Sequence, residues 1–280
     1  MSVNYSAPVE TARSYYNSDD ADNFYFQVWG GEDIHIGLYE GNNDDIATAS
    51  RRTVERMAVV AGPLDQDTRV LDIGSGFGGA ARYLAKTFGC QITCLNLSEK
   101  ENARNRAMNQ AQGLEHLISV IDGSFEAIPA ADESFDLVWS QDAILHSGDR
   151  GRVVGEVARV LRPGGRFVFT DPMQADDCPS GVLQPVLDRI HLSTLASFAF
   201  YRQATAQHHL EEVEIQPLTD QLPVHYERVR QGLEQARDSL TGKVSDHYIE
   251  RMNTGLGHWI EAGNKGYLSW GIMHFRKPAG

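Results

Sequence analysis

A glycine-rich stretch, DIGSGFGG at residues 72–79, constrains the fold of this chain more than any other feature. The apolar run before it, at 69–74, predicts a buried strand, and the segment after it, at 78–89, has helical spacing up to Gly89. Glycines at a strand-to-helix turn let the backbone pass close to a ligand, and the helix N-terminus presents free N–H groups to that ligand. The stretch therefore predicts a ligand site between the first strand and the first helix of an α/β sheet.

The residues that follow continue this alternation of short apolar runs and helical runs. The runs expected as strands are 91–97, 117–123, 135–141 and 166–172, and those expected as helices are 98–113 and 152–161. Such regular alternation specifies a parallel sheet covered on both faces by helices. Two further strand candidates, 213–218 and 267–277, would pair at one end of the sheet. The expected fold class is a Rossmann-like α/β sheet, mostly parallel with one antiparallel edge strand.

Helical segments outside this alternation divide the chain into four parts. Residues 1–65 are mostly helical in pattern and are expected to form an N-terminal lid, whereas residues 66–173 form the ligand-binding core. Residues 174–210 are helical and more apolar than a surface linker needs, so we expect them to cap the substrate site. Residues 211–280 are expected to complete the sheet.

Charge and composition exclude several classes of protein. With 25 basic and 38 acidic residues the net charge is −13, which argues against nucleic acid or an anionic membrane surface as partner. No apolar run approaches the roughly 18–20 residues of a membrane span, and the N-terminus lacks the features of a secretory signal. The three cysteines cannot close a disulfide framework, and Cys90 and Cys94 lack a second Cys/His pair at zinc spacing. We therefore expect a cytoplasmic protein without disulfides or a bound metal.

Lysine is scarce in this acidic chain, since it supplies only five of the 25 basic residues. An acidic, lysine-poor surface is typical of proteins that work at high salt, where screening relieves the repulsion between like charges. An isoelectric point near 5.2 is also common in bacterial proteins, so composition alone leaves both interpretations open.

A dinucleotide site is the first alternative for the glycine-rich turn. Gly74, Gly76 and Gly79 match the pattern G-x-G-x-x-G, but this pattern alone is weak and no second nicotinamide-binding pattern follows it. Asp72 lies two residues before the first glycine, where a carboxylate is awkward for a pyrophosphate but suits an ammonium group. The turn therefore favours a ligand that carries a free amino group.

Two later segments resemble a family whose ligand has that group. FDLVWSQDAILH at 135–146 and LRPGGRFVFTDP at 161–172 come at the intervals of the fourth and fifth strands of S-adenosylmethionine (SAM)-dependent methyltransferases. The chain resembles this family over roughly residues 55–175, which implies SAM as cofactor and S-adenosyl-L-homocysteine as product. The resemblance implies a set of cofactor-binding residues at the strand ends: Asp72, Gly74, Ser75, Gly76, Asn96, Leu97, Ser124, Phe125 and Gln141.

Asn96 departs from the family pattern. In most relatives, as in dinucleotide enzymes, a carboxylate at the end of the second strand binds the ribose hydroxyls. An amide can accept a hydrogen bond from one hydroxyl and donate to the other, so we expect Asn96 to bind the ribose in this chain.

Four segments narrow the resemblance further. They are NFYFQVWGGEDIHIGLYEG at 23–41, CLNLSE at 94–99, SQDAILHSGDR at 140–150 and FTDPMQADD at 169–177. Together they resemble the sarcosine/dimethylglycine N-methyltransferases that complete glycine betaine synthesis in salt-tolerant organisms. The resemblance implies that a small amine attacks the SAM methyl group and directly displaces S-adenosyl-L-homocysteine. It also agrees with the acidic, lysine-poor composition, because betaine is an osmoprotectant.

The amine acceptor sets the requirements of the rest of the site. The attacking amine has a pKa near about 10, so the site must select its neutral form. Aromatic faces attract the quaternary product, and a cation or N–H group must bind the carboxylate. The catalytic candidates are Gln141, His146 and Met173, and the substrate-binding candidates are Tyr25, Trp29, Pro172, Met173 and Tyr201. Further candidates are Tyr16, Tyr39 and Phe200 for the aromatic cage, and Arg150, Arg189, Arg202 and His146 for the carboxylate.

Other functions remain open at this stage. An O- or C-methyltransferase acting on tocopherol or a larger natural product shares these motifs, as does a phosphoethanolamine N-methyltransferase, although no obvious basic cluster for a phosphate is present. A SAM-binding module without catalysis would use the same glycine turn, because binding and catalysis share those residues.

Overall fold

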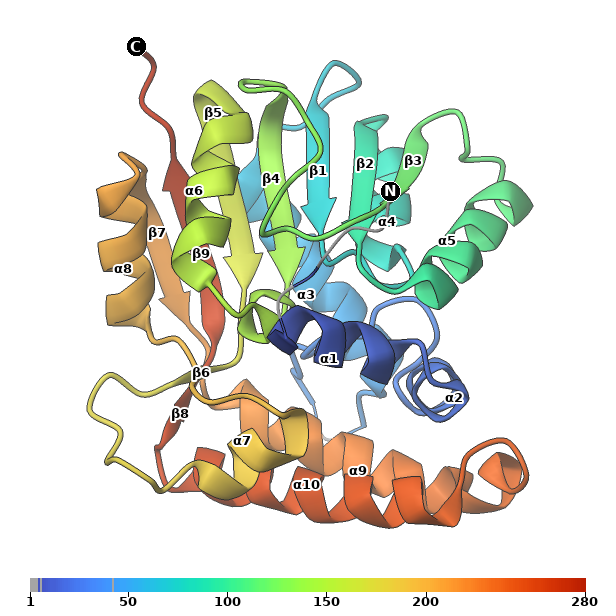
Figure 1. The fold of residues 1–280 in the computed structure, drawn as a ribbon. Helices are drawn as coiled ribbons and strands as arrows, with labels where there is room; N and C mark the ends of the chain where they lie inside the picture. Colours follow the sequence, from blue (N-terminus) through green and yellow to red (C-terminus); the bar gives the residue numbers. More distant parts are fainter. Residues whose placement is uncertain (1–4, 6, 42) are drawn as a thin grey trace.

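The computed structural model describes residues 5, 7–41 and 43–280, so residues 1–4 and 6 of the expected lid, and residue 42, lie outside the described residues. Its centre is a seven-stranded sheet in the order β3-β2-β1-β4-β5-β9-β7 (Figure 1). The strands are β1 (Arg69–Ile73), β2 (Gln91–Asn96), β3 (Ile118–Asp122), β4 (Phe135–Gln141), β5 (Leu161–Thr170), β7 (Glu211–Pro217) and β9 (Gly271–Arg276).

The sheet has the mixed character expected from the sequence. Strands β1 to β5 pair in parallel, and β9 pairs antiparallel with both β5 and β7. The antiparallel strand thus lies one position inside the sheet, with β7 at the edge. The mostly parallel Rossmann-like fold class is confirmed.

Alternating side chains of the strands build an apolar layer on each face of the sheet. Val70 and Leu137 pack under α3 (Ile46–Ala61) and α4 (Gly79–Phe88). Leu71 and Val138 pack under α6 (Arg150–Val160) and α8 (Phe198–Gln207) on the opposite face. Helix α5 (Glu99–Ala111) packs beside β3 and β2.

A third layer of helices lies beyond the carboxyl ends of the parallel strands. It contains α2 (Asp19–Val28), α7 (Gln184–Ile190), α9 (Gln221–Leu240) and α10 (Asp246–Asn264), which share one apolar core. Helix α1 (Ala7–Tyr16) lies between these helices and the sheet (Figure 1). The short antiparallel pair β6 (Met173–Gln174) and β8 (Leu268–Ser269) joins the chain leaving β5 to the chain returning to β9.

The two ranges expected to form the lid and the cap each contribute helices to two different parts of the fold. Within 1–65, α1 and α2 lie at the strand ends, whereas α3 covers the sheet. Within 174–210, α7 packs on α10, whereas α8 packs on α6 and β7. Residues 211–280 were expected to complete the sheet. Besides β7 and β9, this range contains helices α9 and α10, which form most of the layer over the strand ends.

A search of the helices in residues 5, 7–41 and 43–280 finds none with the length and apolarity to cross a membrane.

Candidate active site

Three adjoining cavities open at the carboxyl ends of β1, β2 and β4. The Asn96 cavity, of about 700 Å³, and the Asp72 cavity, of about 310 Å³, share Gly74, Gly76 and Gln141 as lining residues. The sequence predicted nine cofactor-binding residues, and all nine line one or both of these cavities: Asp72, Gly74, Ser75, Gly76, Asn96, Leu97, Ser124, Phe125 and Gln141. They come together because parallel strands end at the same edge of the sheet.

The glycine-rich turn leaves the room for these cavities. Gly74 has φ +74°, a conformation that favours glycine, and a Cβ there would overlap the side chain of Ala143. A Cβ on Gly79, the first residue of α4, would overlap the Asp33 carboxylate and the Glu32 carbonyl. The segment 32–35 therefore lies directly against the turn and closes the Asp72 cavity.

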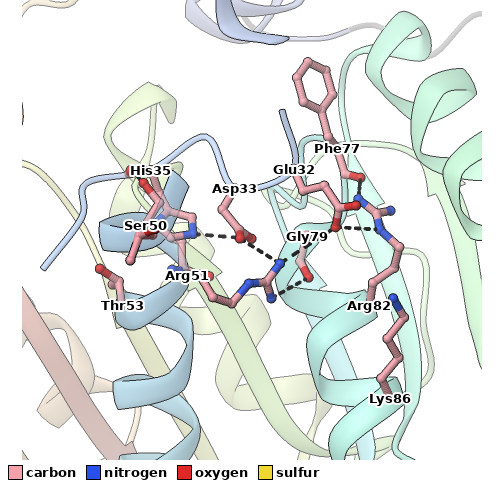
Figure 2. Close-up of polar contacts among 12 residues, drawn as sticks. Glu32, Asp33, His35, Ser50, Arg51, Thr53, Phe77, Gly79, Arg82 and Lys86 are labelled. Carbon is pink, nitrogen blue, oxygen red and sulfur yellow. Dashed lines mark hydrogen bonds and ion pairs between the residues drawn. The ribbon is translucent and has the colours of Figure 1, made fainter. Parts of the chain in front are cut away.

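Two arginines hold this segment in place (Figure 2). The Arg51 guanidinium lies 2.8 Å from Asp33 Oδ2, and its Nη1 donates to the Gly79 carbonyl at 3.4 Å. Arg82 is almost fully buried, and its Nε lies 3.2 Å from Glu32 Oε2 while its Nη2 donates to the Phe77 carbonyl at 2.7 Å. These contacts join the N-terminal segment to α3 and α4.

Several buried polar atoms around the Asp72 cavity have no hydrogen-bond partner. They are Asp33 Oδ1, His35 Nε2, Ser75 Oγ and Gln141 Nε2. Buried polar groups are nearly always hydrogen-bonded, so four such atoms at one cavity indicate a polar ligand. A group with both an ammonium and a carboxylate would provide partners for this mixture of acceptors and donors.

Asp72 is buried in the same cavity. The pKa of its carboxyl is raised to about 7, mainly by burial. The nearby Asp33 contributes to this rise, and His35 opposes it. A cationic ligand would reverse this effect by stabilising the carboxylate. The charge at this cavity fits the amino end of SAM.

The Asn96 cavity contains a carboxylate that the sequence analysis did not identify. Asn96 Nδ2 donates to Glu101 Oε2 at 2.8 Å, and Glu101 also lines the cavity. Burial raises the pKa of Glu101 to about 7, although the hydrogen bond from Asn96 lowers it. The signal was present, since Ser98 and Glu101 match the capping-box pattern S-x-x-E, and Ser98 Oγ accepts from the Glu101 N–H at 3.2 Å.

The third cavity, of about 800 Å³, is named here the Arg189 cavity. It lies between α1, α2 and the helices α7, α9 and α10. Tyr25, Trp29 and Pro172, all predicted substrate-binding residues, line it. Its other aromatic residues are Tyr15, Tyr16, Tyr226 and Trp259, and of these only Tyr16 was predicted.

The Arg189 and Asn96 cavities share one wall, formed by Ala12, Tyr16, Tyr25, Ile34, Asp142 and His146. On this wall the Tyr16 hydroxyl lies 2.9 Å from His146 Nε2. The pKa of His146 is lowered to about 4, mainly by burial and also by the positive charges of Arg150 and Arg189. The imidazole is therefore neutral at physiological pH.

Asp142 connects three parts of the chain at this wall. Its carboxylate accepts hydrogen bonds from the Ile36 N–H at 2.7 Å, Thr170 Oγ1 at 2.8 Å and Trp270 Nε1 at 2.8 Å. Asp142 and His146 lie four residues apart but do not belong to one helical turn, because Asp142 has φ +52° and precedes the 3₁₀ turn Ile144–His146. Both residues nevertheless line both cavities.

The structure places the other predicted residues away from the cavities. Met173 and Tyr201 are fully buried in the core under α6 and α8, where the Tyr201 hydroxyl donates to Asp171 at 2.6 Å. Phe200 is exposed on α8, and the Tyr39 hydroxyl lies 2.9 Å from His225 Nδ1.

Among the four carboxylate-binding candidates, only Arg189 and His146 line the Arg189 cavity. Arg150 donates to the Leu145 and Thr194 carbonyls, and Arg202 pairs with Glu212.

Residues 5, 7–41 and 43–280 contain no group of three His, Cys, Asp or Glu side chains arranged to hold a metal ion. Cys90 and Cys94 are free and buried.

Known proteins share this sequence and fold. A family model described as a methyltransferase domain matches residues 71–169. The chain is 60% identical to the sarcosine/dimethylglycine N-methyltransferase of Halorhodospira halochloris over 96% of both chains. It is 52% identical to the sarcosine/dimethylglycine N-methyltransferase of Aphanothece halophytica over 97% of this chain and 98% of the relative.

A crystal structure from Galdieria sulphuraria, of a protein assigned as a sarcosine dimethylglycine methyltransferase, superposes with a TM-score of 0.90 at 43% identity. It covers 95% of this chain and 100% of the other. These similarities extend over the lid, the sheet and the helices α9 and α10 alike. The chain therefore belongs to the methyltransferase family and, within it, to the sarcosine/dimethylglycine N-methyltransferases.

Proposed function

We propose that this chain is a SAM-dependent N-methyltransferase that converts sarcosine and dimethylglycine to glycine betaine in the cytoplasm. The observation that carries the proposal is the shared wall of Tyr16, Tyr25, Asp142 and His146 between the Asn96 and Arg189 cavities. A cofactor in the first cavity and a small acceptor in the second would meet at this wall. The high identity to enzymes named for these substrates supports the choice of acceptor.

The residues of the first two cavities fit SAM. Asp72 and Asp33 would bind its ammonium group, Asn96 and Glu101 its ribose, and the Ser124 segment its adenine. When bound, SAM would supply a methyl group on a positively charged sulfur, so that a neutral amine attacking this methyl group would displace S-adenosyl-L-homocysteine. The protein contributes mainly by aligning the two reactants and excluding water.

His146 acts in this proposal as a positioning group and not as a strong base. Its pKa of about 4 lies roughly six units below that of the amine, so proton transfer from a protonated amine to His146 would cost about 8 kcal/mol. The amine therefore loses its proton to solvent before it binds. The neutral ring and the Tyr16 hydroxyl then hold the acceptor by hydrogen bonds without adding positive charge beside the reacting nitrogen.

The aromatic lining suits the product. A quaternary ammonium cannot donate a hydrogen bond, but the faces of Tyr16, Tyr25 and Trp29 attract it. The rings of Tyr16 and Tyr25 lie 5.7 Å apart and those of Tyr25 and Trp29 lie 5.2 Å apart, so they form one continuous surface. Each methyl group added to the nitrogen would increase its contact with this surface.

The test of the proposal is an acceptor panel. Purified enzyme and labelled SAM are incubated separately with dimethylglycine, phosphoethanolamine and γ-tocopherol, and the products are identified by mass spectrometry. We expect betaine from dimethylglycine and no transfer to the other two acceptors. Transfer to phosphoethanolamine or γ-tocopherol in preference to dimethylglycine would overturn the proposal.

A further inference from the structure

Arg189 lies at the acceptor cavity without an anionic partner. It belongs to α7, and its Nε is buried and has no hydrogen-bond partner. Its Nη2 donates to the thioether of Met252 at 3.1 Å, which is a weak acceptor. Within the part of the chain that the structure describes, no carboxylate forms an ion pair with it. The residue as a whole is half-buried, and a partly desolvated cation of this kind is costly unless an anion reaches it.

Other arginines near the site are satisfied by the protein itself. Arg104 pairs with Asp22 between α5 and α2, and Arg51 pairs with Asp33. Arg150 donates to two backbone carbonyls. Arg150 Nε is also buried without a hydrogen-bond partner, but Arg150 does not line the Arg189 cavity. Arg189 therefore differs from these neighbours in having an unused donor at that cavity.

Gly255 on α10 makes room for this arginine. A Cβ at Gly255 would overlap Cδ and Nε of Arg189. Glycine is unfavourable inside a helix, and Gly255 is buried in the middle of α10, so its absent side chain serves close packing. The Arg189 side chain crosses α10 at this point on its way to the cavity.

The position of Arg189 matches the geometry of the proposed acceptor. In dimethylglycine a single methylene separates the carboxylate from the nitrogen, so a carboxylate-binding group must lie close to the shared wall. Arg189 lines the same cavity as His146 and Tyr25. A guanidinium binds a carboxylate through two parallel hydrogen bonds, which fixes the orientation of the acceptor as well as its place.

We infer that Arg189 binds the acceptor carboxylate, that Gly255 positions its side chain, and that this pair selects amino acids over amines without a carboxylate. The inference rests on the proposed function. The positive charge has a second effect, because it disfavours the protonated form of an amine bound beside it. Arg189 thus favours both the carboxylate and the reactive state of the nitrogen.

The test compares Arg189→Met and Arg189→Lys with the wild type. We expect the KM for dimethylglycine to rise about 100-fold in Arg189→Met and less in Arg189→Lys, which keeps the charge but loses the paired geometry. Turnover of N,N-dimethylethanolamine, which has no carboxylate, should change less than about threefold. The Kd for S-adenosyl-L-homocysteine, measured by calorimetry, should stay unchanged and shows that the variants fold.

Four further variants sharpen the test. Gly255→Ala should raise the KM for dimethylglycine by about 10-fold through displacement of the guanidinium, whereas Gly257→Ala, where a Cβ would meet nothing within 4 Å, should not. Arg202→Met, on a surface ion pair with Glu212, should behave as wild type. Arg251→Met tests the other arginine that lines the cavity.

The outcomes separate this inference from the proposed function. An unchanged KM for dimethylglycine in folded Arg189→Met, or a larger effect of Arg251→Met, overturns the role of Arg189. If the wild type transfers no methyl group to dimethylglycine, the proposed function fails. Calorimetric binding of dimethylglycine to the S-adenosyl-L-homocysteine complex then decides the inference: loss of binding in Arg189→Met supports it, and absent or unaltered binding overturns it.

Discussion

The Tyr16 hydroxyl lies 2.9 Å from Nε2 of His146, so the last residue of α1 contacts the turn after β4 at the wall between two cavities. The two rings also meet edge to face, with centroids 5.4 Å apart. This contact makes the N-terminal helix part of the site. The Arg189 cavity is complete only when α1 lies in place.

Removal of the Tyr16 hydroxyl should slow the reaction without weakening the cofactor complex. In Tyr16→Phe we expect kcat to fall about 10- to 100-fold, because His146 loses the group that orients it. The Kd for SAM should stay within about twofold. Tyr39→Phe is the control, since the Tyr39 hydroxyl contacts His225 and lies outside the three cavities. Equal kcat values in the two variants would contradict the role of Tyr16.

The rate should follow the protonation of the acceptor and not that of His146. Because burial lowers the pKa of His146 to about 4, this ring is neutral at every pH above about 6. The fraction of neutral amine rises with pH up to its pKa of about 10. At saturating SAM and low dimethylglycine, the rate should therefore rise steadily toward about pH 9. A plateau above pH 7 would show that a group on the enzyme takes the proton.

Asp72→Asn should weaken SAM binding and stabilise the ligand-free protein. Burial raises the pKa of Asp72 in the folded protein to about 7, whereas its pKa in the unfolded chain is near 4. The ionised carboxylate therefore destabilises the fold fully above pH 7, and this cost disappears below about pH 4. We expect the variant to gain about 2–4 kcal/mol at pH 8.5 and nothing near pH 3.5, measured by urea unfolding. Its Kd for SAM at pH 8.5 should rise about 10- to 100-fold. Equal free energies of unfolding for the two proteins at pH 8.5 would show that burial of the Asp72 carboxylate does not destabilise the fold.

Gly79→Ala should disturb the cofactor site through the segment that closes it. A Cβ at this position would overlap the Asp33 carboxylate and the Glu32 carbonyl, so the segment 32–35 must move away from α4. We expect the Kd for SAM to rise about 10-fold, while the KM for dimethylglycine changes little. Gly151→Ala, in the first turn of α6 with its nearest neighbour at 3.5 Å, is the control. A shift in Kd that is the same in both variants would rule out this mechanism.

The residues that line the Asn96 and Asp72 cavities could be predicted because local patterns determine their position. Asp72, Asn96 and Gln141 each lie at the end of a parallel strand, and alternating strand and helix patterns bring such ends together at one edge. Tyr226 and Trp259 could not be predicted in this way. They line the Arg189 cavity from α9 and α10. Helical periodicity shows which face of a helix is apolar, but not which distant element that face will contact.

Pro172 and Met173 illustrate the same limit at neighbouring positions. In an extended chain successive side chains point to opposite sides, so Pro172 lines the cavity while Met173 packs in the core beside Phe169 and Tyr201. Tyr201 lies on α8, which packs against the sheet. The sequence placed Pro172 and Met173 at the end of the fifth strand, but it did not give the direction of their side chains.

Met173→Ala should therefore act on stability. Met173 is fully buried, and truncation of a buried methionine leaves a cavity that costs about 2–5 kcal/mol. The KM for dimethylglycine and the KM for SAM should change by similar factors at a temperature where the variant is folded. A selective rise in the KM for the amine, with unchanged urea stability, would place Met173 at the acceptor.

Methyl transfer from labelled SAM to glycine, sarcosine and dimethylglycine, measured in parallel with the products resolved, tests the central claim most directly. We expect betaine from sarcosine and from dimethylglycine, with little turnover of glycine, because each methyl group adds contact with the aromatic surface of the Arg189 cavity. No transfer to any of the three by a protein that binds SAM would contradict the proposed function and indicate a different acceptor.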